Sequence, residues 1–219
     1  MEITNTYLIV MVIIFILLCI AVYYYYWMPK QSNVNTYKIP LITSETIFDE
    51  SYNSIIRLNT LVSRNTLYVP KLGYGLTFSW EMYIPSLGGN DKWQTSYNHL
   101  KPIIAMNDSP IISYHPKKNY ISITLKYRNN PFYAQFAEIK FEDIKLQKWV
   151  KYIIVIENRN ISMYVDGILS STKTLPSIIS IGDLNTDIVL GEENNNFLGK
   201  IRNLTLYPYP LSYNEIGLI

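Results

Sequence analysis

Two patterns of hydrophobic and polar positions divide the chain. From Tyr7 to Trp27 it reads YLIVMVIIFILLCIAVYYYYW, without a charged residue, a Pro or a Gly. At a rise of about 1.5 Å per residue, a helix of this length crosses the roughly 30 Å hydrocarbon core of a bilayer. The remainder is mixed in polarity, as expected of a segment that folds in water. The pattern predicts a short tail at 1–6, a transmembrane α-helix at 7–28, a polar linker at 29–36 and one folded domain at 37–219.

The apolar run has the features of an uncleaved anchor rather than of a secretory signal peptide. A signal peptide begins with basic residues and ends with small ones, whereas the first six residues here carry Glu2 and no Lys or Arg. Tyr and Trp side chains concentrate at the membrane–water interface, and a Lys just beyond them marks the exit into water. A buried core helix is the alternative, although so long an uncharged run is unusual in a soluble domain. The predicted interface residues are Tyr23, Tyr24, Tyr25, Tyr26, Trp27 and Lys30.

Two features of the sequence disagree about the side of the membrane on which the domain lies. Lys30 and Lys38 follow the run and no basic residue precedes it, which favours a cytoplasmic domain. Three glycosylation sequons, beginning at Asn107, Asn160 and Asn203, suit a lumenal domain. Asn is abundant in this chain, so sequons also arise by chance. We therefore expect a single-pass protein of a cellular or virion membrane, with the face unassigned.

Beyond the linker, nearly every segment alternates between apolar and polar positions with period two. Residues 76–84, 121–127 and 161–165 follow this pattern, which is typical of strands with one buried and one exposed face. Val150–Ile156 is more continuously apolar, as a central strand would be. Asp166-Gly167 is a strong hairpin signal because both central positions of such a turn favour positive φ. Many short strands without a helical period favour an all-β sandwich of two antiparallel sheets or a jelly roll.

One strand near the end of the chain requires an irregularity. Phe197 and Ile201 have one parity, whereas Leu204 and Leu206 have the other. A β-bulge inserts one residue and so exchanges the two faces of a strand. We therefore predict a bulge near Arg202-Asn203 that keeps all four apolar side chains inward.

Four segments resemble, in order and spacing, the strands of one known family. They are LTFSWEMYI at 76–84, QKWVKY at 147–152, ISMYVDG at 161–167 and FLGKIRNL at 197–204, the last followed by Leu211-Ser212 and Glu215-Ile216. These segments resemble a laminin G-like domain of the concanavalin A-like lectin/glucanase superfamily. The resemblance implies a concanavalin A-like jelly-roll sandwich of two curved antiparallel sheets, with the first and last strands paired. It also places Trp80 and Trp149 in the core.

The composition of the domain argues against several kinds of chemistry. Lys and Arg number 19 against 17 Asp and Glu, and they are scattered, so no nucleic-acid partner is indicated. The only Cys is Cys19 in the apolar run, and His99 and His115 are the only histidines, which argues against a thiol nucleophile and a multi-His metal site. A glycosidase needs two carboxyl groups roughly 5 to 9 Å apart. The densest acidic group, at 138–143, alternates with apolar residues and is interpreted as a solvated strand face. We expect no enzymatic activity.

The predicted ligand-binding residues lie in the longest irregular stretch, 85–99. Trp93 is flanked by polar residues and fits neither strand parity, which favours an exposed aromatic contact at a rim of the sandwich. A Trp93 that folds back to cap the core is the alternative. Tyr207 and Tyr209 form a weaker candidate of the same kind. The predicted binding residues are Asn90, Asp91, Trp93, Gln94 and Tyr97.

No cofactor is required by the sequence, and Ca²⁺ is the one candidate that the family resemblance suggests. Laminin G-like domains often hold Ca²⁺ at a rim through Asp and backbone carbonyl oxygens, which are the ligands that a hard cation prefers. The candidates by loop position are Asp91, Asp108 and Asp183. An ordinary polar turn is the simpler interpretation of each.

Two functions from different classes are consistent with these features. The first is a membrane-anchored, non-catalytic binding domain that recognises a glycan or a protein surface through its rim loops. The second is a structural protein that ties a membrane to a protein shell, for example a virion inner membrane to a capsid. The expected partners are a lipid bilayer, contacted through residues 7–28, and a glycan or protein ligand. Because residues 31–37 reach only about 20 Å when extended, either function is exercised close to the bilayer.

Overall fold

The computed structural model describes residues 16–19, 38–49, 51–57, 75–85, 98–130, 133–179 and 187–219. The chain forms two units, 1–36 and 37–219. In the first unit, residues 16–19 are helical. The rest of the predicted transmembrane helix, its interface residues, the tail and the linker lie outside the described residues. Within the described part of the chain, no helix is long and apolar enough to cross a membrane.

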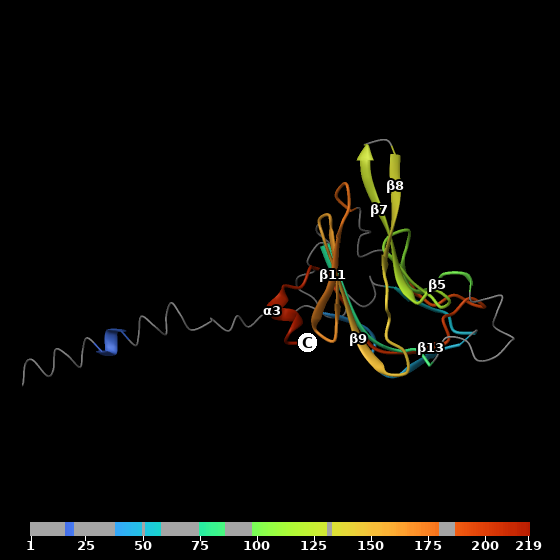
Figure 1. The fold of residues 1–219 in the computed structure, drawn as a ribbon, viewed down its shortest axis with the longest axis horizontal. Coiled ribbons are helices and arrows are strands. Elements are labelled where there is room, and N and C mark those ends of the chain that lie inside the picture. The colour runs from blue at the N-terminus through green and yellow to red at the C-terminus, as the bar shows by residue number, and fades with distance from the viewer. Residues whose placement is uncertain are drawn as a thin grey trace, which may run out of the picture. The chain divides into compact units, whose positions relative to one another are not determined.

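Two antiparallel sheets form the second unit (Figure 1). Sheet A contains, in spatial order, β1 (Ile39–Ile42), β13 (Gly199–Tyr207), β4 (Gly75–Tyr83), β9 (Trp149–Glu157), β10 (Asn160–Val165) and β11 (Ile168–Thr174), and β2 (Thr46–Phe48) also pairs with β13. Sheet B contains β3 (Ser54–Arg57), β12 (Asp187–Leu190), β5 (Lys101–Met106), β6 (Ile111–His115), β7 (Tyr120–Asn130) and β8 (Tyr133–Phe141). The pairing of β1 with β13 joins the first and last strands, as the family resemblance implied. The predicted all-β sandwich is confirmed.

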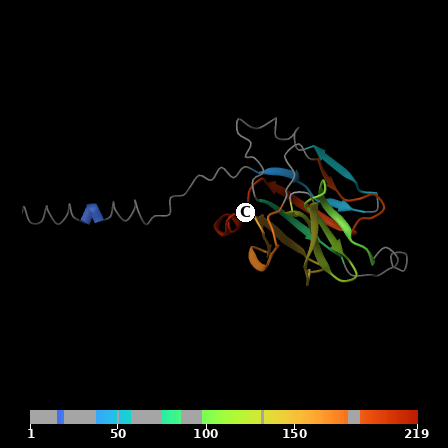
Figure 2. The ribbon, with the colours of Figure 1, turned by 90° about the horizontal axis from the view of Figure 1, so that it is seen from above.

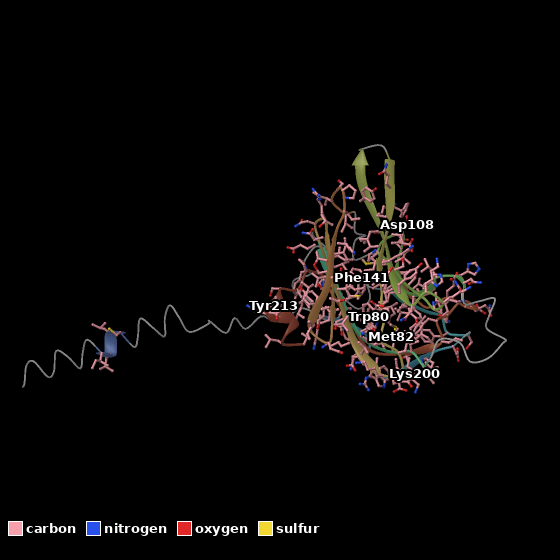
Figure 3. All side chains as sticks on the ribbon, in the orientation of Figure 1. Trp80, Met82, Asp108, Phe141, Lys200 and Tyr213 are labelled. Carbon is pink, nitrogen blue, oxygen red and sulfur yellow. The ribbon has the colours of Figure 1, made fainter. Side chains whose placement is uncertain are left out.

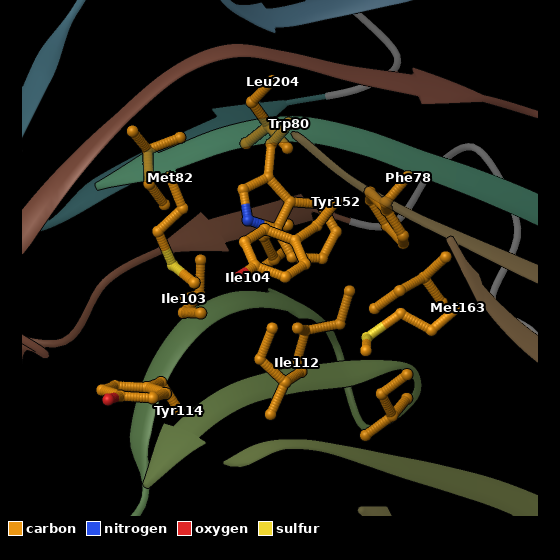
Figure 4. Close-up of a cluster of buried hydrophobic side chains, with 14 of the residues drawn as sticks. Phe78, Trp80, Met82, Ile103, Ile104, Ile112, Tyr114, Tyr152, Met163 and Leu204 are labelled. Atoms are coloured by element: carbon orange, nitrogen blue, oxygen red, sulfur yellow. The ribbon is translucent and has the colours of Figure 1, made fainter. Parts of the chain in front are cut away.

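The main core lies between the two sheets (Figure 4). Phe78, Trp80 and Met82 point into it from β4, and each is at most 1% exposed. Ile112 and Tyr114 meet them from sheet B with no exposed surface. The alternation in residues 76–84 therefore marks the buried face of β4 correctly, and Trp80 is a core residue as predicted.

The two predicted backbone irregularities are present. Asp166 and Gly167 join β10 to β11 with φ values of 50° and 81°, the left-handed conformation expected of the hairpin turn. In β13, Arg202 lies opposite Glu81 and Thr205 lies opposite Ser79, so one extra residue is accommodated. Asn203 there has φ 54°. The bulge keeps the four apolar side chains of this segment buried: Phe197, Ile201, Leu204 and Leu206.

The outer face of sheet A is more covered than the sequence indicates. Thr77 and Ser79 were expected on an exposed face, but they are only 0% and 4% exposed. The chain after β13 folds back over this face. The Leu211 backbone N–H donates to the Thr77 hydroxyl oxygen at 2.9 Å, and that hydroxyl donates to the Tyr209 carbonyl oxygen at 3.1 Å.

The covering segment adds a second, smaller hydrophobic cluster, here called the outer cluster. It consists of Ile153, Val155, Tyr207, Leu211 and Ile216. A one-turn helix, α3 (Tyr213–Ile216), supplies its last member. The Glu215 carboxylate accepts hydrogen bonds from the Ser212 backbone N–H at 2.7 Å and the Ser212 hydroxyl at 2.6 Å, which fixes the start of this helix. No helix was predicted in the domain, so this element is a correction.

The hairpin turn allows a direct test of backbone strain. We expect Gly167→Ala to lower the unfolding free energy by about 1 kcal/mol, because φ at this position is positive while nothing lies within 4 Å of the added Cβ. Gly217→Ala is the matched control, since φ there is −69° and the nearest atom is an ordinary 3.6 Å away. Urea unfolding of both variants measures the difference. A cost at Gly217 equal to that at Gly167 would contradict the explanation.

Candidate ligand-binding surface

One end of the sandwich, here called the loop rim, carries the loop that was singled out in the sequence. β4 ends opposite the start of β9, where Tyr83 pairs with Trp149. β5 begins at the same end, where Lys101 lies opposite Tyr114 near the end of β6. The connection from β4 to β5 therefore begins and ends at this rim, and its described parts are Ile84–Pro85 and 98–100. The predicted binding residues Asn90, Asp91, Trp93, Gln94 and Tyr97 lie outside the described residues and stay a prediction.

A single buried amide ties together the other connections at the loop rim. Asn196 is 5% exposed. Its side-chain nitrogen donates to the carbonyl oxygens of Asp49 and Tyr52, both at 2.6 Å. Its side-chain oxygen accepts the Glu192 backbone N–H at 3.0 Å. The connection before β13 is thereby fixed to the connection between β2 and β3.

A buried cation also lies at this rim. Lys101 is 3% exposed, and its ammonium donates to the Asn195 side-chain oxygen at 2.8 Å. The Asn195 amide in turn donates to the Glu192 carboxylate. Neither Lys101 nor Asn196 stands out in the sequence, because nothing in the neighbouring residues distinguishes them from ordinary strand and turn positions.

Next to the loop rim, the uncovered part of the outer face of sheet A carries a compact aromatic and charged group. We call it the Trp149 patch. The Arg202 guanidinium carbon lies 4.2 Å from the centre of the Trp149 ring, and the Tyr83 ring centre lies 5.8 Å from it. The patch is completed by Glu81 and Asn203. Trp149 is half-buried on this outer face, so its expected place in the core was wrong.

Hydrogen bonds to one carboxylate hold the Trp149 patch in place. Arg202 donates from Nε and Nη2 to the same oxygen of Glu81 at 2.8 and 2.7 Å. Asn203 donates from Nδ2 to the other oxygen at 2.8 Å. Two consecutive residues of a regular strand would point to opposite faces, so the bulge is what brings both to Glu81.

The environment of Glu81 sets its protonation. Partial burial acts to raise the pKa of this carboxyl, but the hydrogen bonds from Asn203 and Arg202 and the positive charges of Arg202 and Lys151 outweigh it. The pKa therefore lies below its ordinary value. A depressed carboxyl pKa contributes stability above the unfolded-state pKa, and that stability is lost as the pH falls through the folded-state value.

This linkage can be measured through unfolding. At pH 7 we expect Glu81→Gln to lower the unfolding free energy by about 1 kcal/mol, because the charge-assisted hydrogen bonds are weakened. Below pH 4.5 the difference from the unmodified protein should shrink as Glu81 protonates. Glu45→Gln is the control, since Glu45 pairs with Lys200 at 2.7 Å but is 43% exposed, and such surface pairs contribute little. A difference at position 81 that grows with acidification would contradict the assignment.

Of the three candidate calcium ligands, Asp108 is the one that lies among the described residues. Asp108 lies in the turn after β5, at the opposite end of this strand from the loop rim, and Figure 3 shows it far from Lys200. It forms an ion pair with Lys126 at 3.1 Å. Asp91 and Asp183 lie outside the described residues. Within the described ranges, no group of three or more His, Cys, Asp or Glu side chains is arranged to hold a metal ion.

Two further sequence interpretations are settled by the packing. Tyr207, considered as an exposed contact, is 4% exposed beneath the segment that follows β13, so that interpretation was wrong. Tyr209 is half-buried beside it, and burial raises the pKa of Tyr209 to about 12. Glu138 lies on the outer face of β8 and contacts Ser122 at 2.8 Å and Lys140 at 3.2 Å. Glu138 and Lys140 form a solvated strand face, as predicted, whereas Glu142 and Asp143 are exposed just after β8 ends.

Comparison with known proteins agrees with this architecture. The receptor-binding domain of botulinum neurotoxin D is 18% identical over 85% of this chain and 45% of its own, with a TM-score of 0.57. The botulinum neurotoxin serotype G binding domain is 16% identical over 86% and 46%, with a TM-score of 0.59. A third similar structure is the binding domain of botulinum neurotoxin DC in complex with rat synaptotagmin II, at 16% identity, 83% and 45% coverage and a TM-score of 0.54.

These structural similarities show the fold, and the chain spans less than half the length of each of the three proteins. No curated protein sequence matches it. A laminin G-like family model matches residues 66–217. The chain belongs to the concanavalin A-like lectin/glucanases superfamily.

Proposed function

We propose that residues 37–219 form a non-catalytic binding domain, held at a membrane by residues 7–28, that recognises a glycan or a protein surface. The observation that carries the proposal is the Trp149 patch beside the loop rim. It presents two aromatic rings and a guanidinium on one sheet face, and Trp, Tyr and Arg are the residues enriched where proteins bind other proteins. The predicted loop contacts around Trp93 would extend the same surface.

The chemistry of the described polar groups supports binding rather than catalysis. Glu81 and Glu138 are each engaged by neighbouring donors on open sheet faces. His115 is 6% exposed and packs against Tyr120 in a tilted arrangement with ring centres 4.9 Å apart. Burial, with the charge of Lys118 as a smaller cause, lowers the pKa of His115, so it is neutral at physiological pH. None of these groups is set against a nucleophile in the way that acid–base catalysis requires.

Two independent features support the two parts of the proposal. The similar structures described above are named as binding or receptor-binding domains of toxins, one of them in complex with a protein. The membrane part is supported by the uncharged run from Tyr7 to Trp27. The face of the membrane that carries the domain is left unassigned in the proposal.

The test is a binding screen of the purified 37–219 unit on a glycan array and on immobilised membrane and surface proteins. For any ligand found, we expect Trp149→Ala to weaken binding at least about tenfold, because an aromatic side chain that the ligand covers contributes that much binding energy. Tyr213→Ala is the matched control, since Tyr213 is an aromatic residue that is 70% exposed on α3 and lies outside the patch. Circular dichroism verifies that both variants are folded.

Three results would contradict the proposal. Hydrolysis of a glycan by the domain would overturn the non-catalytic assignment. Equal losses for Trp149→Ala and Tyr213→Ala would remove the Trp149 patch as the binding surface. Stoichiometric recovery of the full chain in an assembled particle, without any ligand in the screen, would replace the proposal by the alternative of a structural link between membrane and shell.

A further inference from the structure

Exposed apolar side chains gather at one place on the outer face of sheet A. Tyr213 is 70% exposed and Leu218 is 84% exposed on the segment that follows β13, and Leu169 is 49% exposed on β11. We call these three residues the apolar flank. Among the described residues of the domain, the other exposed large apolar side chains are Ile47 on β2, Ile55 on β3, Phe136 on β8, Ile168 in the first position of β11, Ile178 and Ile219. Single exposed apolar side chains of this kind are normal on a protein surface.

Packing and pairing place the members of the apolar flank around the outer cluster. Leu169 pairs with Tyr164, and Tyr164 pairs with Ile153 of the outer cluster. Ile216, which follows Tyr213 by one helical turn, belongs to the same cluster. Lys151 joins the segment that carries Leu218 to the turn before Leu169. Its ammonium contacts the backbone oxygen of Ile219, and its backbone N–H donates to the Asp166 side chain at 3.0 Å. Figures 1 and 2 both show the end of the chain beside the β10–β11 hairpin.

The start of the domain lies on the same sheet. Ile39, the first residue of β1, pairs with Leu206, one residue before β13 ends. The segment that carries Tyr213 and Leu218 leaves from that end of β13 and crosses the outer face. Residues 31–37, between the predicted interface Lys30 and this point, reach only about 20 Å when extended. If residues 7–28 are held in a bilayer, the linker keeps the start of the domain within about 20 Å of that bilayer.

We propose that the apolar flank lies in the interface of the bilayer that holds residues 7–28, an inference that rests on the proposed membrane function. Tyr213 suits the headgroup level, where an aromatic ring with a polar tip is stable, and Leu169 and Leu218 suit the acyl boundary. Such contact fixes which way the domain faces. Because Trp149 lies two residues before Lys151 on the same face of β9, this contact also holds the Trp149 patch close to the bilayer surface, where a ligand attached to that membrane would be met.

The size of the flank favours lipid over a second copy of the chain as its occupant. A stable protein–protein interface buries about 1,200 Å² or more and involves about twenty residues on each side. Three side chains supply far less. A tethered domain needs only a weak lipid contact, because the tether already provides a high effective concentration of bilayer.

The experiment uses the full chain in phosphatidylcholine vesicles, with Cys19→Ser removing the only native thiol. A fluorescent label is attached at Leu218→Cys in one variant and at Ile55→Cys in the other. Ile55 is the matched control because it is an aliphatic residue that is 62% exposed on sheet B. We expect lipids that carry a quencher near the headgroup to quench the label at position 218 several-fold more strongly than the label at position 55.

Carbonate extraction of the same vesicles separates the failure of this inference from the failure of the proposed function. If the chain is retained and both positions are quenched equally, the proposed contact of the apolar flank with the bilayer is wrong, and the proposed membrane anchor is unaffected. A label at position 218 that is shielded from both the lipid quencher and an aqueous quencher indicates a protein partner and also overturns it. If carbonate releases the chain, residues 7–28 do not anchor it, and the proposed contact of the apolar flank with the bilayer is wrong as well.

Discussion

Replacing Trp80 with Ala should destabilise the domain by about 4 kcal/mol, which is the largest single-residue effect we expect. Trp80 has no exposed surface and lies in β4, a central strand of sheet A between β13 and β9. Its ring centre is 5.9 Å from that of Tyr152, and Met82 and Ile112 belong to the same core cluster. Removing the ring leaves a cavity that rigid strands on both sides cannot close. Urea unfolding, with the slope of the transition unchanged, measures the loss.

Trp80→Phe separates packing from hydrogen bonding at the same site. The indole N–H of Trp80 has no hydrogen-bond partner among the described residues. Phe keeps most of the ring and removes a donor that is not satisfied, so we expect a cost of only about 1 to 2 kcal/mol. A loss as large as that of Trp80→Ala would show that the indole N–H makes a bond that matters. Tyr213→Ala, at an exposed position, should change stability by less than about 0.5 kcal/mol.

The strands of the domain were predictable because their two faces meet different environments. Residues 76–84, 121–127 and 161–165 have one face in the core, and a buried face selects apolar residues at every second position. The bulge at Arg202-Asn203 followed from the same rule, since a change of parity within one strand requires an extra residue. The turn at Asp166-Gly167 followed from backbone sterics alone.

The errors arose where a distant segment changes the environment of a strand. Thr77 looked exposed because its neighbours in sequence alternate, yet Leu211, 134 residues away, covers it. Trp149 looked like a core residue because of its size, but it shares the outer face with Lys151 two residues later. Helix α3 has only four residues, too few to show a helical period, and its one local signal was the pair Ser212 and Glu215.

The candidate surface was less predictable than the strands. Most of the loop at 85–99 lies outside the described residues, so its residue assignments stay predictions. The Trp149 patch was not foreseen because it needs three strands in register, with Glu81, Trp149 and Arg202 coming from β4, β9 and β13. Lys101 and Asn196 were missed for the same reason. Their roles depend on partners that only the folded chain brings close.

Asn196→Asp should destabilise the domain by about 3 kcal/mol at pH 7, although the two side chains have the same shape. The amide nitrogen donates to the Asp49 and Tyr52 carbonyl oxygens at 2.6 Å, and a carboxylate would place negative charge against both. Asn196→Ala should cost about 2 kcal/mol, because it leaves buried groups without partners but adds no charge.

The pH dependence of Asn196→Asp distinguishes repulsion from a loss of packing. Repulsion raises the pKa of the new carboxyl in the folded state, so the lost stability should be partly recovered as the pH falls through that value. Asn194→Asp is the matched control, since Asn194 is exposed in the same connection and has a φ of 62° that Asp also adopts. Urea midpoints between pH 4 and 8 give the comparison. If Asn196→Asp were no worse than Asn194→Asp, the buried amide would not be what fixes the connection before β13 to the connection between β2 and β3.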